Sequence, residues 1–181
     1  MVLTLGLVLL LAGLVVGAFY GTLEFVQIKD TSSRFCALLR TARAQAANEG
    51  RRFRIRFDPE TTQPQVTFEP DPLGEPGEFR NVLTWWARAA ELAGGVRVQR
   101  CELTGAAAFA GLDPSQLADD EEGSERAALT FYPDGSSDSA CIVLAHDDEE
   151  HPWAVEITLN GVDGTISTRQ IDAEEYFSEA P

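Results

Sequence analysis

The chain has 181 residues, of which 44% are apolar and 24% charged, a composition typical of one folded domain with an appendage. The formal net charge is −15 and is unevenly distributed: residues 29–56 carry a net +6, whereas residues 57–181 carry a net −20. Because an acidic body repels phosphate backbones, we expect no nucleic-acid partner.

The chain opens with a long uncharged segment, Val2–Leu23. At ~1.5 Å per residue a helix of this length spans ~30 Å, the thickness of a bilayer's hydrocarbon core. No Lys or Arg precedes the segment and no A-x-A site follows it, so an uncleaved anchor over residues 1–24 is favoured over a signal peptide. The side chains expected to pack in the membrane and against neighbouring helices are Val2, Leu3, Leu5, Leu7, Val8, Leu9, Leu10, Leu11, Leu14, Val15, Val16 and Phe19.

The helix is expected to continue past the membrane over residues 25–50. No proline occurs before Pro59, and Gly50 is a natural C-terminal stop. The whole helix would be ~70 Å long. Its second half is amphipathic, with an apolar stripe expected to pack against the rest of the protein: Phe35, Leu38, Leu39, Ala42 and Ala46.

After Gly50 the hydrophobic period changes from 3.6 to 2, which predicts a β-rich head domain over residues 51–181. Residues 81–92 are ambiguous between strand and helix, and residues 104–126 read as a long exposed excursion with an acidic run at 119–122. The fold class predicted is α+β, with a long N-terminal helix and a two-sheet antiparallel head. The expected strands are 51–57, 65–69, 96–103, a hairpin of 128–132 with 140–145, and a hairpin of 153–160 with 165–170.

The three cysteines are too few for a disulfide framework. We favour the interpretation that Cys36, Cys101 and Cys141 are small buried hydrophobic residues. A bridge between Cys101 and Cys141 is the alternative if the domain lies in an oxidising compartment.

No catalytic, cofactor or metal motif is present in the sequence. His146 and His151 flank the acidic run 147–150, but a solvated loop explains that run better than a metal site. Trp85 and Trp86 could line a ligand groove, although core packing is the more common role of at least one such residue. We therefore expect no catalytic residues, no cofactor and no enzyme.

Three stretches resemble the minor pseudopilins of type II secretion, in particular their GspH and FimT branch. Residues Phe35–Arg52 match the end of the family's helix, a run of the form L-R-x-A-R-x-x-A followed by basic residues and a strand. Residues Leu129–Ser137 resemble its F-x-P-D-G-S hairpin, and Gly164–Ser167 resemble its closing G-x-I/V segment. The order and spacing of the three stretches agree with the family.

The front of the chain departs from this pattern. The resemblance implies a short basic leader cut before Phe-Thr-Leu-x-Glu and a methylated new N-terminus, and the given sequence shows neither the leader nor that Glu. Because Met1–Gly6 looks like what normally follows that motif, we interpret Met1 as an internal methionine. A leader would also settle the orientation, since the nearest cations follow the span and by themselves would place the head in the cytoplasm.

The resemblance implies a structural minor pseudopilin of a type II secretion or type IV pilus-like filament that contributes to protein export. Its expected partners are other pseudopilins or pilins, the inner membrane and an exported protein. It would cross the inner membrane once, with its head in the periplasm. Some FimT-type relatives bind DNA through basic heads, which the net −20 of residues 57–181 argues against.

Two hypotheses from other classes remain open at this point. The first is a membrane-anchored periplasmic β-domain that binds a ligand or envelope partner without entering a filament. The second is a membrane-tethered enzyme, which would need convergent polar residues around Trp85 and Trp86 or around His146 and His151.

Overall fold

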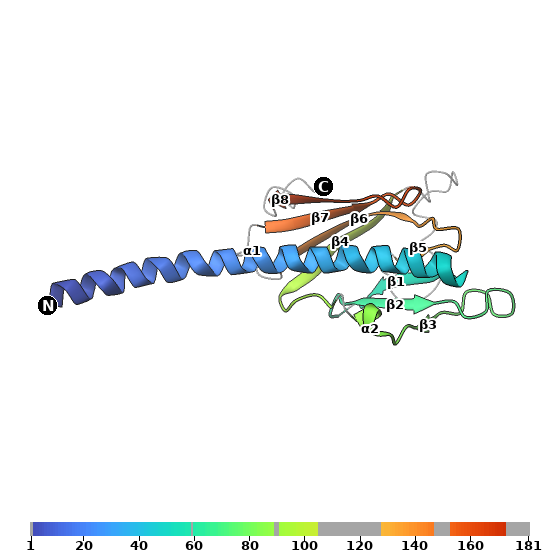
Figure 1. Ribbon diagram of the computed structural model, residues 1–181, viewed down its shortest axis with the longest axis horizontal. Coiled ribbons are helices and arrows are strands. Elements are labelled where there is room, and N and C mark those ends of the chain that lie inside the picture. The colour runs from blue at the N-terminus through green and yellow to red at the C-terminus, as the bar shows by residue number, and fades with distance from the viewer. Residues whose placement is uncertain (1, 59, 89–90, 105–127, 147–152, 173–181) are drawn as a thin grey trace.

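The computed structural model is elongated, with one long helix that projects from a β-rich head (Figure 1). It describes residues 2–58, 60–88, 91–104, 128–146 and 153–172, with side chains described from residue 26 onward. The architecture is α+β, with a long N-terminal helix followed by two antiparallel sheets, as the sequence predicts.

Helix α1 runs from Val2 to Glu49 and forms the spine of the molecule. Its first half projects beyond the head, and its second half lies along both sheets (Figure 1). The helix stops at Gly50, whose φ of 63° is a left-handed conformation that favours glycine and ends a helix. Among the residues with described side chains, no helix is long and apolar enough to cross a membrane. The segment Val2–Leu23 and its packing residues lie outside that range.

The first sheet has four strands in the order β3-β2-β1-β5, where β1 is Phe53–Phe57, β2 is Pro64–Phe68, β3 is Arg80–Asn81 and β5 is Leu129–Phe131. The alternation read from the sequence is real, because Phe53, Ile55 and Phe57 are buried while the arginines between them point away from the core.

The second sheet has the order β4-β6-β7-β8, where β4 is Val96–Thr104, β6 is Ser139–His146, β7 is Trp153–Leu159 and β8 is Ile166–Asp172. The hairpin predicted for the end of the chain is confirmed as β7 paired with β8. The ambiguous region 81–92 begins at the end of strand β3 and then forms the short helix α2, Trp85–Arg88.

The hairpin predicted for residues 128–132 and 140–145 is wrong, because β5 belongs to the first sheet and β6 to the second. After the turn, β5 makes one isolated bridge to the segment that precedes β6, between Phe131 and Ser137. Asp138 then occupies the place of a pairing strand: its N–H donates to the Thr130 carbonyl at 2.9 Å, and its carboxylate accepts the Thr130 N–H at 2.9 Å. The chain thereby crosses from one sheet to the other.

The core lies between the buried face of α1 and the inner faces of the two sheets. All five side chains of the predicted stripe lie in it, with Phe35, Leu39, Ala42 and Ala46 at 0% exposure and Leu38 at 3%. The buried face also extends about two turns further toward the N-terminus than the predicted stripe, to Ile28. The predicted excursion 104–126 falls almost wholly outside the described residues.

Candidate functional site

The three stretches that resemble one family meet at a single side chain, Arg43 of α1. Its Nε donates a hydrogen bond to the carbonyl of Gly135, in the turn between β5 and β6. Its Nη1 donates to the carbonyl of Asp163, in the turn between β7 and β8, at 2.7 Å. One guanidinium thus joins the helix to both turns, because its planar set of donors can serve two acceptors at once.

The close approach of Arg43 explains the glycine that follows in the second turn. A Cβ on Gly164 would lie 1.2 Å from Nη1 of Arg43, and the residue has a φ of 72°. The two turns also contact each other directly: the Ser137 N–H donates to the Gly161 carbonyl at 2.8 Å, and the Gly161 N–H donates to Oγ of Ser139 at 2.8 Å. Helix and turns form one interlocked unit.

An open groove of about 540 Å³ runs beside this unit, between the helix and the two turns. Arg40, Ala44 and Ala47 line the helix side, and Asp134 and Val162 line the turn side. The carboxylate of Asp134 is held within its own turn, since Ser136 donates to it through its hydroxyl at 2.6 Å and its N–H at 2.9 Å. These bonds lower the pKa of Asp134 below its usual value.

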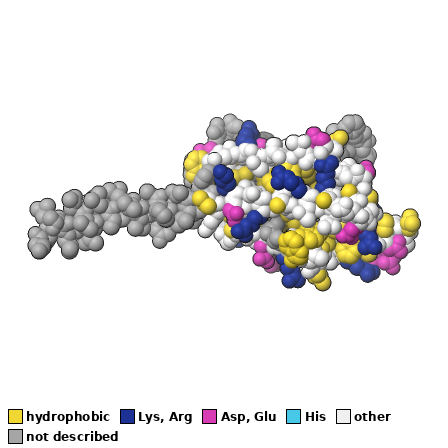
Figure 2. Space-filling view, in the orientation of Figure 1, with side chains coloured by type: hydrophobic (Ala, Val, Ile, Leu, Met, Phe, Trp, Pro, Cys, Tyr) yellow, Lys and Arg dark blue, Asp and Glu magenta, His cyan; other side chains and the backbone are white. Residues whose placement is uncertain are grey.

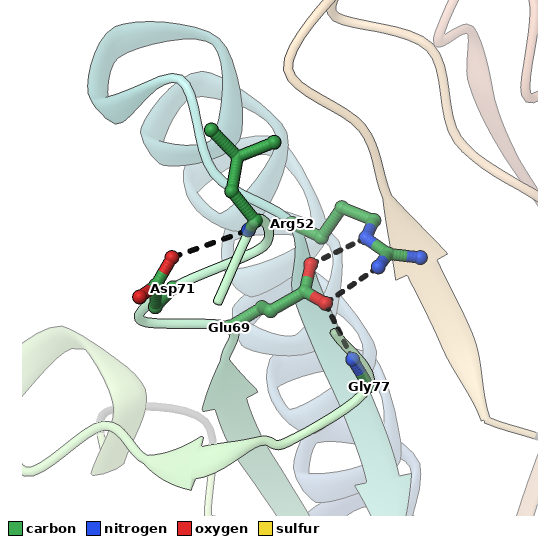
Figure 3. Close-up of polar contacts among 5 residues, drawn as sticks. Arg52, Glu69, Asp71 and Gly77 are labelled. Atoms are coloured by element: carbon green, nitrogen blue, oxygen red, sulfur yellow. Dashed lines mark hydrogen bonds and ion pairs between the residues drawn. The ribbon is translucent and has the colours of Figure 1, made fainter. Parts of the chain in front are cut away.

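A second polar cluster lies at the edge of the first sheet where β1 begins and β2 ends (Figure 3). The carboxylate of Glu69, at 0% exposure, accepts two hydrogen bonds of 2.5 Å from the guanidinium of Arg52. It also accepts the Gly77 N–H at 2.7 Å. The bonds from Arg52 and Gly77 outweigh the effect of burial and lower the pKa of Glu69.

Sequence reasoning missed the roles of both Arg43 and Glu69. A signal for Glu69 was present, because pairing of the two predicted strands at 51–57 and 65–69 puts Arg52 next to Glu69. The partners of Arg43 carried no such signal, since they are backbone carbonyls in turns that lie far along the chain.

The cysteines are free thiols, so the alternative of a bridge between Cys101 and Cys141 does not hold. Cys101 is paired across the strands with Ile142, and Cys141 with Glu102, so the two thiols point to opposite faces of the second sheet. Burial raises the pKa of Cys101 to about 11 and also raises that of Cys141. A raised pKa leaves less of each thiol in the reactive thiolate form at neutral pH.

The tryptophans and histidines do not converge on a pocket in the described part of the chain. Trp86 packs on Phe53 with their ring centroids 6.1 Å apart, while Trp85 is 81% exposed. His146 lies beside Gly95, and His151 is outside the described residues. In the part of the chain that the structure describes, no group of three His, Cys, Asp or Glu residues could hold a metal ion.

Comparison with known protein families identifies the family to which this chain belongs. The family model described as Type II transport protein GspH matches residues 31–162, well over half of the chain. The chain belongs to the GspH family. As a member it is a structural pseudopilin, which assembles with other pseudopilins or pilins into a type II secretion or pilus-like filament.

Solved structures agree on the fold. Two structures of the minor pseudopilin EpsH from the type II secretion system of Vibrio cholerae are similar to this chain, with TM-scores of 0.52 and 0.51. They are 15% and 17% identical to it in sequence, and each comparison covers 81% of this chain and 97% of the other. A search of curated protein sequences gave no match.

Proposed function

We propose that this GspH-family pseudopilin is a minor filament subunit of a type II secretion system. In this proposal residues 1–24 anchor it in the inner membrane, residues 25–50 join anchor to head, and residues 51–181 form a periplasmic head. The observation that carries the proposal is the division of α1, whose second half is built into the head while its first half projects away from it (Figure 1).

The exposed face of the second half of α1 supports packing against a neighbouring subunit. Ser33, Ala37 and Ala44 are exposed on this face, and their small side chains allow another backbone to approach closely. The opposite face is fully occupied by the head's own core. The helix can therefore contact a neighbour without disturbing its own domain.

The sequence supports the membrane part of the proposal. The 22 residues Val2–Leu23 lack any formal charge, and a helix of that length matches a hydrocarbon core ~30 Å thick. We propose that the exported protein is a further partner and that the chain takes no catalytic part in export.

Photo-crosslinking from the exposed helix face tests the proposal. Benzophenone-alanine in place of Ala37, in the full chain in its native cells, is expected to form adducts with other pilin-like subunits. The same variant in cells that lack the other pseudopilins is the control and should form none. If the chain fractionates with the inner membrane yet gives no pilin-like adduct, the alternative of a β-domain that never enters a filament is correct.

A further inference from the structure

The loop between β2 and β3, residues 70–78, extends past the end of α1 at the tip of the head farthest from the N-terminus (Figure 1). Its apolar residues face solvent: Leu73 is 96% exposed, and Pro72 and Pro76 are also exposed. Apolar, acidic and basic side chains lie together at this end of the molecule in the space-filling view (Figure 2). Leu73 and the two prolines thus form an exposed apolar tip rimmed by polar residues, a feature typical of interaction sites.

The loop is held in shape by polar contacts, so its leucine is presented in a fixed position. At its start, the carboxylate of Asp71, which Figure 3 labels, accepts the N–H groups of Leu73 at 3.2 Å and Gly74 at 2.9 Å. At its end, the buried carboxylate of Glu69 accepts the Gly77 N–H at 2.7 Å. A loop ordered before it binds loses less conformational entropy when it docks.

The ion pair between Arg52 and Glu69 also supports a loop that is held in one shape. A fully buried carboxylate is unfavourable unless it is paired and hydrogen-bonded, and Glu69 divides its bonds between Arg52 of the sheet and Gly77 of the loop. The pair therefore connects the loop to the sheet instead of merely filling the core.

The charges around Leu73 indicate the chemistry of its partner. Asp71, Glu75 and Glu78 flank the apolar tip along the loop and are exposed. The cation nearest in sequence, Arg80, contacts Glu75 at 3.8 Å, with both side chains more than half exposed. The complementary surface is an apolar pocket with a basic rim. A second copy of this chain fits poorly, because its head, residues 51–181, carries a net −16.

We propose that the loop 70–78 is a docking arm whose Leu73 inserts into a basic-rimmed apolar pocket of a different pilin-like subunit, stacked on this end of the head. The proposal rests on the filament role proposed above, because subunits stacked along the helix direction meet at this end. Glu69 acts as a positioning residue that holds the arm in its docking shape.

The test is benzophenone crosslinking from position 73 in the full chain in its native cells, with adducts mapped by peptide mass. We expect adducts with a pilin-like subunit other than this chain, at apolar residues flanked by Lys or Arg. Position 83 is the matched control, because Leu83 is also exposed, at 76%, but lies outside the loop. Adduct yield from position 73 should exceed that from position 83 at least fivefold.

Two further variants separate docking from folding. Leu73→Ala should lower capture of that subunit at least fivefold while leaving the denaturation midpoint unchanged, whereas Leu83→Ala should change neither. Glu69→Gln, combined with the crosslinker at position 73, should spread the adducts over several sites because the arm is no longer held.

Three results would overturn the proposal: adducts from position 73 to an exported protein, adducts to a second copy, or equal yields from positions 73 and 83. Crosslinking from position 37 on α1 distinguishes the docking-arm proposal from the proposal of a filament role. Adducts from position 37 without any from position 73 would reject the docking arm and keep the filament role. No pilin-like adducts from either position would reject both.

Discussion

At the scale of single residues, Arg43 is the side chain on which the packing of helix and turns depends. Arg43→Ala leaves the carbonyls of Gly135 and Asp163 without their donor. Because hydrogen bonds to a charged donor contribute about 1.5–3 kcal/mol and this site is partly exposed, we expect a loss of about 1–2 kcal/mol in unfolding free energy. Denaturant unfolding of the full chain in detergent measures it.

Arg40→Ala is the matched control, because Arg40 lies one turn away on the same helix and is exposed beside the groove. Its removal should change the unfolding free energy by less than about 0.5 kcal/mol. Equal losses in the two variants would show that the contacts of Arg43 with the turns contribute nothing of their own.

Glu69 should make the stability of the head sensitive to acid. Its pKa in the folded protein lies below the usual value of 4.5, chiefly because Arg52 donates hydrogen bonds to the carboxylate. A carboxyl with a lowered folded pKa contributes stability in full above its unfolded pKa and loses it as the pH falls through the folded value. The unfolding free energy should therefore decrease as the pH is lowered below about 4.5.

The Glu69→Gln variant isolates this contribution from that of the many other carboxylates. The difference in unfolding free energy between the two proteins should be largest at neutral pH and should shrink as the pH falls below 4.5. Unfolding curves measured from pH 7 to pH 3 would give that difference. A difference that stays constant over the whole range would contradict the ion pair.

At the scale of elements, the sequence predicted what local periodicity determines. Helix α1, its buried stripe and the β7–β8 hairpin follow from spacings of 3.6 or 2 residues and from glycines at turns. The separation of β5 from β6 could not be predicted in this way, because a proline-led turn between apolar strands is also typical of a hairpin. The carboxylate of Asp138, which occupies the pairing position beside Thr130, decides between the two.

The position of Asp138 gives a prediction for this crossing between sheets. Asp138→Ala removes the acceptor of the Thr130 N–H and of the Tyr132 hydroxyl, which donates at 3.1 Å. Since Thr130 is only 7% exposed, its N–H would be left unsatisfied, at a cost of about 1–3 kcal/mol in unfolding free energy. Hydrogen exchange at Thr130 should speed up by at least tenfold in this variant.

Asp163→Ala serves as the comparison for that crossing, since its carboxylate accepts the Thr165 N–H at 2.7 Å in an exposed turn. Water can replace this acceptor, so we expect a loss below about 1 kcal/mol. If the two variants lose the same stability, the capping of β5 by Asp138 is not what holds the crossing.

At the scale of the whole molecule, a basic stretch over the second half of α1 and strand β1 is followed by a strongly acidic remainder. The stretch 29–56, which includes the second half of α1, carries a net +6, while residues 57–181 carry a net −20. Two copies placed side by side in a filament would bring two strongly acidic heads together. A less acidic neighbour avoids this repulsion. This agrees with a minor subunit whose neighbours in the filament are other pilin-like proteins.

This charge predicts how salt affects self-association of the full chain. Repulsion between the heads should keep it monomeric in detergent at 10 mM salt, where screening extends over about 30 Å. At 1 M salt the screening length falls to about 3 Å, and self-association should increase. Sedimentation velocity at the two salt concentrations measures this, and a dimer that weakens as salt rises would show that the copies attract each other through complementary charges instead.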